Sequence, residues 1–210
     1  MTDDDLPALT GPVEVVGAGL IGTSIALVCS RLGIEVVLRD TSEENLRTAH
    51  GLGAGRVATP DDRPQLVVVA VPPASVGDAI VDALSRTGAV VTDVGSVKAA
   101  PFEEVAGRVG PDDLGRYVGS HPMAGSERSG PLAASAALFD GRPWAVTPHP
   151  HARPDAVRRR SLSTITKRRQ ALDGFAGPQS QKPGARSFCG SKRSQTETVP
   201  PAGVTWRSPR

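Results

Sequence analysis

The sequence contains few aromatic residues and almost no cysteine. Aromatic side chains make up 3% of its 210 residues, so Val, Leu, Ile and Ala must supply most of a core. The two cysteines, Cys29 and Cys189, lie far apart and outside any CxxC spacing. They therefore suggest neither a disulfide framework nor a metal site.

Long apolar runs are also missing from the sequence. None approaches the roughly 18 residues that a membrane-spanning helix needs. The acidic N-terminus, MTDDDLPALTGP, lacks the basic and apolar regions of a secretory signal. We therefore expect a cytoplasmic protein without membrane contact, beginning with a flexible segment at residues 1–12.

Charge is distributed unevenly along the chain. Residues 1–150 hold 19 acidic and 11 basic residues, a net charge of −8, whereas residues 151–210 hold 3 acidic and 13 basic residues, a net charge of +10. Such a break in charge indicates two parts that must be interpreted separately.

The first 150 residues alternate apolar, strand-like runs with segments of helical periodicity. Ile21, Ile25, Val28 and Leu32 follow the spacing of one helix face, which Gly33 ends. Strands are expected at 13–19, 34–40, 65–73, 89–96, 116–122 and 142–148, and helices at 20–33, 42–53, 74–86, 98–108 and 131–138. This alternation predicts an α/β domain at 13–150 with a doubly wound, mostly parallel sheet.

A glycine-rich loop joins the first expected strand to the first expected helix. The letters GAGLIG place Gly17, Gly19 and Gly22 at the GxGxxG spacing of a dinucleotide-binding loop of the Rossmann type. Gly17 permits the tight turn, Gly19 lets the backbone approach a pyrophosphate, and Gly22 lets helix and strand pack closely. The free N–H groups of the helix N-terminus favour phosphate. A glycine-rich turn without a ligand is the alternative.

The end of the second expected strand bears on the choice of cofactor. Asp40, about 20 residues beyond the glycines, is placed to accept hydrogen bonds from ribose hydroxyls, which favours NAD. Asp40 would repel a 2′-phosphate, although Arg39 would partly offset this, so NADP stays open. Asp40 could instead simply flank the next helix. The remaining expected cofactor-binding residues are Leu20, Ile21 and Val71.

One histidine stands out as a candidate catalytic residue. Among His50, His121 and His149, only His121 follows a strand at the carboxyl edge of the expected sheet, and Pro122 restricts its backbone to extended geometry. Histidine suits proton transfer near neutral pH. Ser96, in the preceding strand-end loop, offers a hydroxyl to a histidine or a substrate. A structural histidine and an N-cap serine are the alternatives.

Four motifs in order, VVGAGLIGTSIA, LVVVAVPP, VVTDVGSVK and GSHPMAGSE, resemble the prephenate dehydrogenases of the tyrosine pathway over about residues 13–150. The resemblance implies that His121 accepts a hydrogen bond from the ring hydroxyl of the substrate, assisted by Ser96. It also implies that Glu127 helps gate the substrate pocket and that Ser126 lies near the substrate. The implied reaction is an NAD(P)-dependent oxidative decarboxylation of prephenate to 4-hydroxyphenylpyruvate.

Residues 151–210 do not match the all-helical dimer domain that follows in this family. They are basic, rich in Ser, Pro, Gly and Gln, and show no sustained helical periodicity, which predicts a disordered tail. A frameshifted or truncated gene model is the favoured explanation; a genuine basic tail and a divergent helical domain are alternatives. No nucleic-acid recognition motif appears, so a nucleic-acid partner is not expected.

Two functions follow from these observations. The first is prephenate dehydrogenase, with arogenate as an alternative substrate and with activity weakened by the loss of the dimer domain. The second is a non-catalytic NAD-binding remnant. Fold alone does not choose between them, so the choice depends on the site residues.

Overall fold

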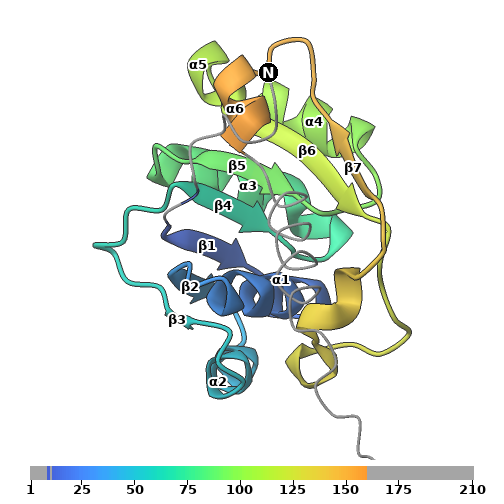
Figure 1. The fold of residues 1–210 in the computed structure, drawn as a ribbon. Helices are drawn as coiled ribbons and strands as arrows, with labels where there is room; N and C mark the ends of the chain where they lie inside the picture. The colour runs from blue at the N-terminus through green and yellow to red at the C-terminus, as the bar shows by residue number, and fades with distance from the viewer. Residues whose placement is uncertain (1–8, 10, 160–210) are drawn as a thin grey trace, which may run out of the picture. The chain divides into compact units, whose positions relative to one another are not determined.

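The computed structural model describes residue 9 and residues 11–159, and a single mixed sheet organises them. Its strand order is β3-β2-β1-β4-β5-β6-β7, and all neighbouring strands are parallel except β6 and β7 (Figure 1). The strands are β1 (Val13–Val16), β2 (Val36–Arg39), β3 (Arg56–Val57), β4 (Leu66–Val69), β5 (Val90–Asp93), β6 (Tyr117–Pro122) and β7 (Trp144–Thr147). The predicted doubly wound, mostly parallel α/β fold is confirmed.

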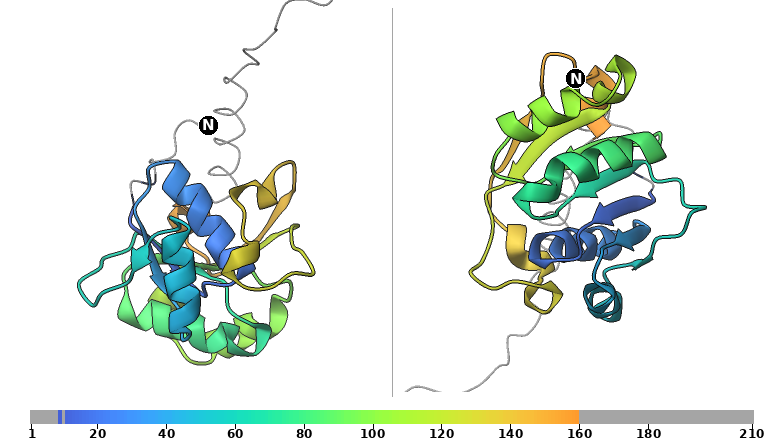
Figure 2. Two further views of the ribbon diagram at one scale, coloured as in Figure 1. Left: turned by 90° about the horizontal axis from the view of Figure 1, so that it is seen from below. Right: turned by 180° about the vertical axis from the view of Figure 1, so that it is seen from behind.

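Helices cover both faces of this sheet. The α-helices are α1 (Leu20–Arg31), α2 (Glu43–Gly51), α3 (Val76–Arg86), α4 (Ala99–Ala106), α5 (Pro111–Leu114) and α6 (Pro154–Arg159). The described residues also form the 3₁₀ turns η2 (Pro73–Ser75), between β4 and α3, and η3 (Pro131–Ala133) and η4 (Ala136–Phe139), between β6 and β7. The view from behind shows α3 and α4 covering the face of the sheet opposite to α1 (Figure 2).

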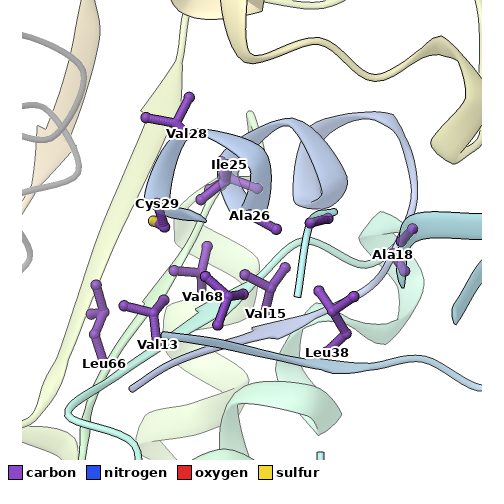
Figure 3. Packing of buried hydrophobic residues seen from close by; sticks show 14 of the residues in the cluster. Val13, Val15, Ala18, Ile25, Ala26, Val28, Cys29, Leu38, Leu66 and Val68 are labelled. Carbon is purple, nitrogen blue, oxygen red and sulfur yellow. The ribbon is translucent and has the colours of Figure 1, made fainter. Parts of the chain in front are cut away.

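Two apolar clusters, one on each face, form the core. Figure 3 shows Ile25, Ala26 and Cys29 of α1 directed at the strand residues Val13, Val15 and Val68. The second cluster packs α3 against β4 and β5. Every residue of β4 and β5 is buried, as expected for parallel strands covered on both faces. β4 is apolar throughout, whereas β5 ends in the buried polar residues Thr92 and Asp93. Burial also raises the pKa of the Cys29 thiol to about 12.

The segment at 131–138 differs from the single helix that the sequence predicts. It forms η3 and η4, separated by Ala134 in an extended conformation. The Ser135 N–H donates a hydrogen bond to Ser24 Oγ of α1 at 3.0 Å, and Ser135 Oγ caps η4 by accepting from Ala137 N at 3.1 Å. These bonds draw the backbone away from a continuous helix and tie it to α1.

Short elements were missed in the sequence, and one of them lies beyond the expected domain boundary. β3, α5 and α6 have only two, four and six residues, too few to show a periodic pattern. α6 lies in the part predicted to be a disordered tail from residue 151, and its Ala156 is fully buried in the α1-side cluster. Helical structure therefore continues past residue 150, while most of the predicted tail lies outside the described residues.

The glycine-rich loop joins β1 to α1 in a tight turn, in which two glycines have no room for a Cβ atom. Gly17 has φ +100°, and a Cβ at this position would lie 2.4 Å from the Ala70 carbonyl oxygen. A Cβ at Gly22 would lie 1.9 Å from the carbonyl oxygen of Gly17. Both contacts are with backbone, which cannot move aside, so only glycine fits at these two positions.

This close packing predicts that two alanine substitutions in the glycine-rich motif differ in their effect on stability. Gly22→Ala should lower the free energy of unfolding by at least about 2 kcal/mol, because the added methyl overpacks against backbone. Gly19→Ala is the matched control: φ at Gly19 is −81°, and a Cβ there meets no atom within 4 Å. Urea denaturation followed by circular dichroism measures both. Equal stability of the two variants would contradict the packing argument.

Candidate functional site

A cleft opens at the carboxyl edge of the sheet, between β1 and β4, where the strand order reverses direction. Open α/β sheets bind ligands at this switch point. The cavity measures about 870 Å³. It is lined by the glycine-rich loop, by the ends of β2 and β4, and by a loop that follows β6: Val16, Gly17, Gly19, Leu20, Ile21, Arg39, Asp40, Thr41, Ser42, Asn45, Ala70, Val71, Pro72, Ser75, Arg128, Ser129 and Gly130.

Most of the residues predicted to bind the cofactor lie in this one cavity. Its lining includes Gly17, Gly19, Leu20, Ile21, Arg39, Asp40 and Val71. Gly22 does not line it, because this residue packs against Gly17 behind the loop. The open space above Gly19 and the lack of a side-chain cap at the N-terminus of α1 leave the backbone accessible from the cleft. A pyrophosphate fits such a cradle.

Both carboxylate oxygens of Asp40 accept backbone hydrogen bonds. Oδ2 accepts from the Ala18 N–H at 2.6 Å, inside the glycine-rich loop, and Oδ1 accepts from the Ser42 N–H at 2.7 Å. Asp40 thus ties the end of β2 to the loop after β1. Each carboxylate oxygen has a second lone pair, so Asp40 can still accept a hydroxyl from the cleft.

Arg39, next to Asp40, forms an ion pair that the sequence analysis did not foresee. Its Nε lies 2.7 Å from Oε1 of Glu14, a β1 residue whose side chain is 1% exposed. Arg86 of α3 binds the same carboxylate through two N–H groups, at 2.9 and 3.0 Å. Glu14 is therefore a buried acid shared by two arginines, one of which reaches the cleft.

His121 lies within β6, near its carboxyl end, because pairing with β7 extends that strand as far as Pro122. Its Nδ1 lies 3.1 Å from the carbonyl oxygen of Val94, at the end of β5. A carbonyl can only accept, so Nδ1 carries the proton in this contact. In the neutral tautomer that carries its proton on Nδ1, the lone pair of Nε2 can accept a hydrogen bond.

The other predicted site residues are exposed. Ser96 does not cap α4, whose N-cap residue is Lys98, and no hydrogen bond joins Ser96 to His121 within the part of the chain that the structure describes. Ser126 Oγ accepts from the Arg128 N–H at 3.1 Å, and Glu127 is exposed beside it. Arg128 itself lines the cleft and was missed, because a single exposed arginine carries no pattern in the sequence.

A buried acid, Asp93, organises the loop that carries Ser96. Its side chain is fully buried at the end of β5. Oδ1 accepts from the Tyr117 hydroxyl at 2.9 Å, while Oδ2 accepts from the Gly95 N–H at 3.0 Å and pairs with Lys98 Nζ. Burial, and then the charge of Asp93, raise the pKa of Tyr117 well above its ordinary value, so Tyr117 stays a donor.

The remaining histidines of the domain have structural contacts. His50 is exposed, and its Nδ1 lies 2.8 Å from the Gly55 carbonyl. His149 packs on Phe102 with ring centroids 4.8 Å apart, and burial lowers the pKa of its imidazole. It lines a second, smaller cavity of about 330 Å³ beside β6 and β7.

Residues 9 and 11–159 hold neither a cluster of metal ligands nor a membrane-spanning helix. No group of three or more His, Cys, Asp and Glu side chains there is arranged to hold a metal ion. No helix in these ranges is long and apolar enough to cross a membrane.

Comparison with known proteins assigns the family. The sequence model described as "Prephenate dehydrogenase, nucleotide-binding domain" matches residues 25–167, more than half of the chain. The chain belongs to this family. The described part of the chain therefore contains a nucleotide-binding domain of this family.

Two curated relatives match this chain over only part of their own length. The probable prephenate dehydrogenase NovF of Streptomyces niveus is 44% identical over 135 residues, which cover 64% of this chain and 37% of NovF. The cyclohexadienyl dehydrogenase of Zymomonas mobilis is 32% identical over 157 residues, covering 69% of this chain and 52% of that protein. The chain thus spans about half of these relatives or less.

A solved structure supports the same family. The prephenate dehydrogenase of Aquifex aeolicus in complex with hydroxyphenyl propionate and NAD⁺ matches this domain with a TM-score of 0.65 and 26% identity. The match covers 73% of this chain and 56% of that one. Similarity therefore extends over most of the nucleotide-binding domain described here.

The contacts of Asp93 with Tyr117 and Lys98 predict losses of stability of different size for different substitutions. Tyr117→Phe removes one donor to a buried carboxylate and should lower the free energy of unfolding by about 1.5–3 kcal/mol. Asp93→Asn leaves Lys98 without its counter-charge and should cost about 3–5 kcal/mol. Chemical denaturation measures both. Asp155→Asn, at a half-exposed ion pair with Arg153, is the control and should cost under about 1 kcal/mol. If Asp155→Asn lost as much stability as Asp93→Asn, the argument would be contradicted.

Proposed function

We propose that this domain binds NAD in the cleft between β1 and β4 and belongs to an enzyme that oxidatively decarboxylates prephenate. One observation carries the proposal. The glycine-rich loop and the segment that directly follows the GSHPMAGSE stretch line a single cavity, through Gly17 and Gly19 on one wall and Arg128 and Ser129 on the other. The cofactor loop and the residues next to the substrate motif therefore meet at one edge of the sheet.

The lining of the cleft fits a dinucleotide. The pyrophosphate would lie over Gly19, where the backbone is open and the N–H groups of α1 begin. Asp40 would accept a hydrogen bond from an adenosine ribose hydroxyl through its remaining lone pairs, which favours NAD over NADP. Arg128, on the opposite wall, supplies a positive charge toward the phosphates.

His121 supplies the proton acceptor in this proposal. With Nδ1–H donated to the Val94 carbonyl, Nε2 would accept the hydroxyl proton of the cyclohexadienyl ring. NAD, when bound, accepts the hydride from the ring carbon. Loss of carbon dioxide then makes the ring aromatic and gives 4-hydroxyphenylpyruvate. Ser96, three residues before the start of α4, is proposed to donate a hydrogen bond to the oxygen of the same hydroxyl. Arogenate would undergo the same chemistry at its ring.

Binding of NAD tests the first half of the proposal. Gly19→Ala should weaken NAD binding at least tenfold, because a methyl group would occupy the space over which the pyrophosphate approaches. Isothermal titration of the purified 210-residue chain measures the affinity, and thermal unfolding of the free protein confirms an unchanged fold. NAD binding that is equally tight in wild type and in Gly19→Ala would place the cofactor elsewhere.

Turnover of prephenate tests the second half. His121→Asn keeps an amide donor for the Val94 carbonyl but has no acceptor at the position of Nε2, so kcat should fall by about 10²–10⁴. NADH formation measures turnover, and His50→Asn, at an exposed histidine on α2, is the matched control. Unchanged kcat in His121→Asn would remove His121 from the mechanism. NAD binding by the wild-type chain without turnover would identify a nucleotide-binding module instead.

A further inference from the structure

Two neighbouring residues at the end of β2 favour different cofactors. Asp40 favours the free ribose hydroxyls of NAD, whereas a cation at this edge of the sheet can bind the 2′-phosphate of NADP. Arg39 is such a cation, and it lines the cleft beside Thr41, Ser42 and Asn45. The choice of cofactor therefore depends on where the guanidinium of Arg39 is held.

Strand register shows that Arg39 bends away from the strand end. Arg39 lies opposite Val16 in the β1–β2 ladder, and Glu14 lies opposite Val37, two residues back along β2. Side chains two residues apart project from the same face of a sheet. Arg39 must therefore reach back by about 6–7 Å to bring its Nε to the Glu14 carboxylate. This contact holds the Nε side of the guanidinium over the face of the sheet, while Arg39 still lines the cleft.

The Glu14 carboxylate is itself held in place. It is buried beneath α3, and Arg86 binds both of its oxygens. Arg39 and Arg86 share Oε1, at 2.7 and 2.9 Å. A carboxylate this deeply buried loses much stability when it loses one of its charged donors. Arg39 can thus leave Glu14 for a 2′-phosphate only by breaking a charge-assisted hydrogen bond.

We propose that Glu14 is a positioning residue that determines cofactor specificity: by holding Arg39 against the sheet, it selects NAD and disfavours NADP. The inference rests on the proposed binding of NAD in this cleft. NADP binding carries the cost of breaking the Glu14–Arg39 contact. NAD binding leaves that contact intact, so Glu14 acts on the ratio of the two affinities and not on binding in general.

The experiment measures the dissociation constants of NAD and NADP for three variants by isothermal titration. Glu14→Gln keeps the volume of the side chain but removes its charge, so Arg39 is held less firmly. The ratio Kd(NADP)/Kd(NAD) should fall about tenfold, the effect of weakening one charge-assisted hydrogen bond. Adding Arg39→Gln to Glu14→Gln should restore the wild-type ratio, because the gain in NADP binding requires the arginine.

Arg86→Gln is the matched control. Arg86 binds the same carboxylate but does not line the cleft, so its loss should lower stability and leave the affinity ratio within about twofold of wild type. An equal change of the ratio in Arg86→Gln and Glu14→Gln would overturn the proposal, as would an unchanged ratio in Glu14→Gln. If Glu14→Gln does not fold, Glu14→Asp replaces it, because this variant retains the charge on a shorter side chain. It should lower the ratio about threefold. An unchanged ratio in Glu14→Asp would equally overturn the proposal.

Failure of this inference and failure of the proposed function give different results. If the wild-type chain binds neither dinucleotide, the cofactor proposal is wrong and Glu14 has no specificity to determine. If it binds NAD and the variants leave the ratio unchanged, the cofactor proposal stands and the role of Glu14 is refuted.

Discussion

The backbone contact between Gly17 and Gly22 is the constraint on which the rest of the cleft depends. The carbonyl oxygen of Gly17 occupies the position that a Cβ of Gly22 would need, and Gly17 itself turns with a positive φ against the end of β4. Helix α1 can therefore start immediately at the switch point of the sheet, with the first N–H groups of the helix facing the cavity. A longer or looser turn would move that positive helix end away from the ligand.

Three acidic side chains then fix the loops around this edge, and each does so by accepting several donors. Asp40 joins the end of β2 to the glycine-rich loop, Glu14 joins β1 to β2 and α3, and Asp93 joins β5 to β6 and to the loop containing Ser96. Carboxylates suit this task because each oxygen accepts two hydrogen bonds. Part of the strongly acidic composition of the domain thus serves internal architecture. These networks join the strands and loops around the cleft.

Much of the fold could be predicted from the sequence because its signals are local. The apolar runs that became β4 and β5 and the helical spacing around Ile25 lie within single elements, and the parallel α/β class followed from their alternation. Elements of two to six residues, such as β3 and α6, escaped prediction because tertiary contacts stabilise them. The break at Ala134 escaped it for a related reason, since Ser24, 111 residues away from Ser135, holds the turn.

In the candidate site, too, some features follow from local sequence and others depend on tertiary contacts. The sequence by itself predicted seven of the positions that line the cleft, from Gly17 to Val71, and His121 as the candidate base, because motif spacing and strand ends are encoded locally. Only the tertiary structure decided the state of these groups: the protonated Nδ1 of His121, the two amides bound to Asp40, and the hold of Glu14 on Arg39. Each depends on groups brought together from distant parts of the chain, as Glu14 and Arg86 are across 72 residues, and no local pattern specifies such a meeting.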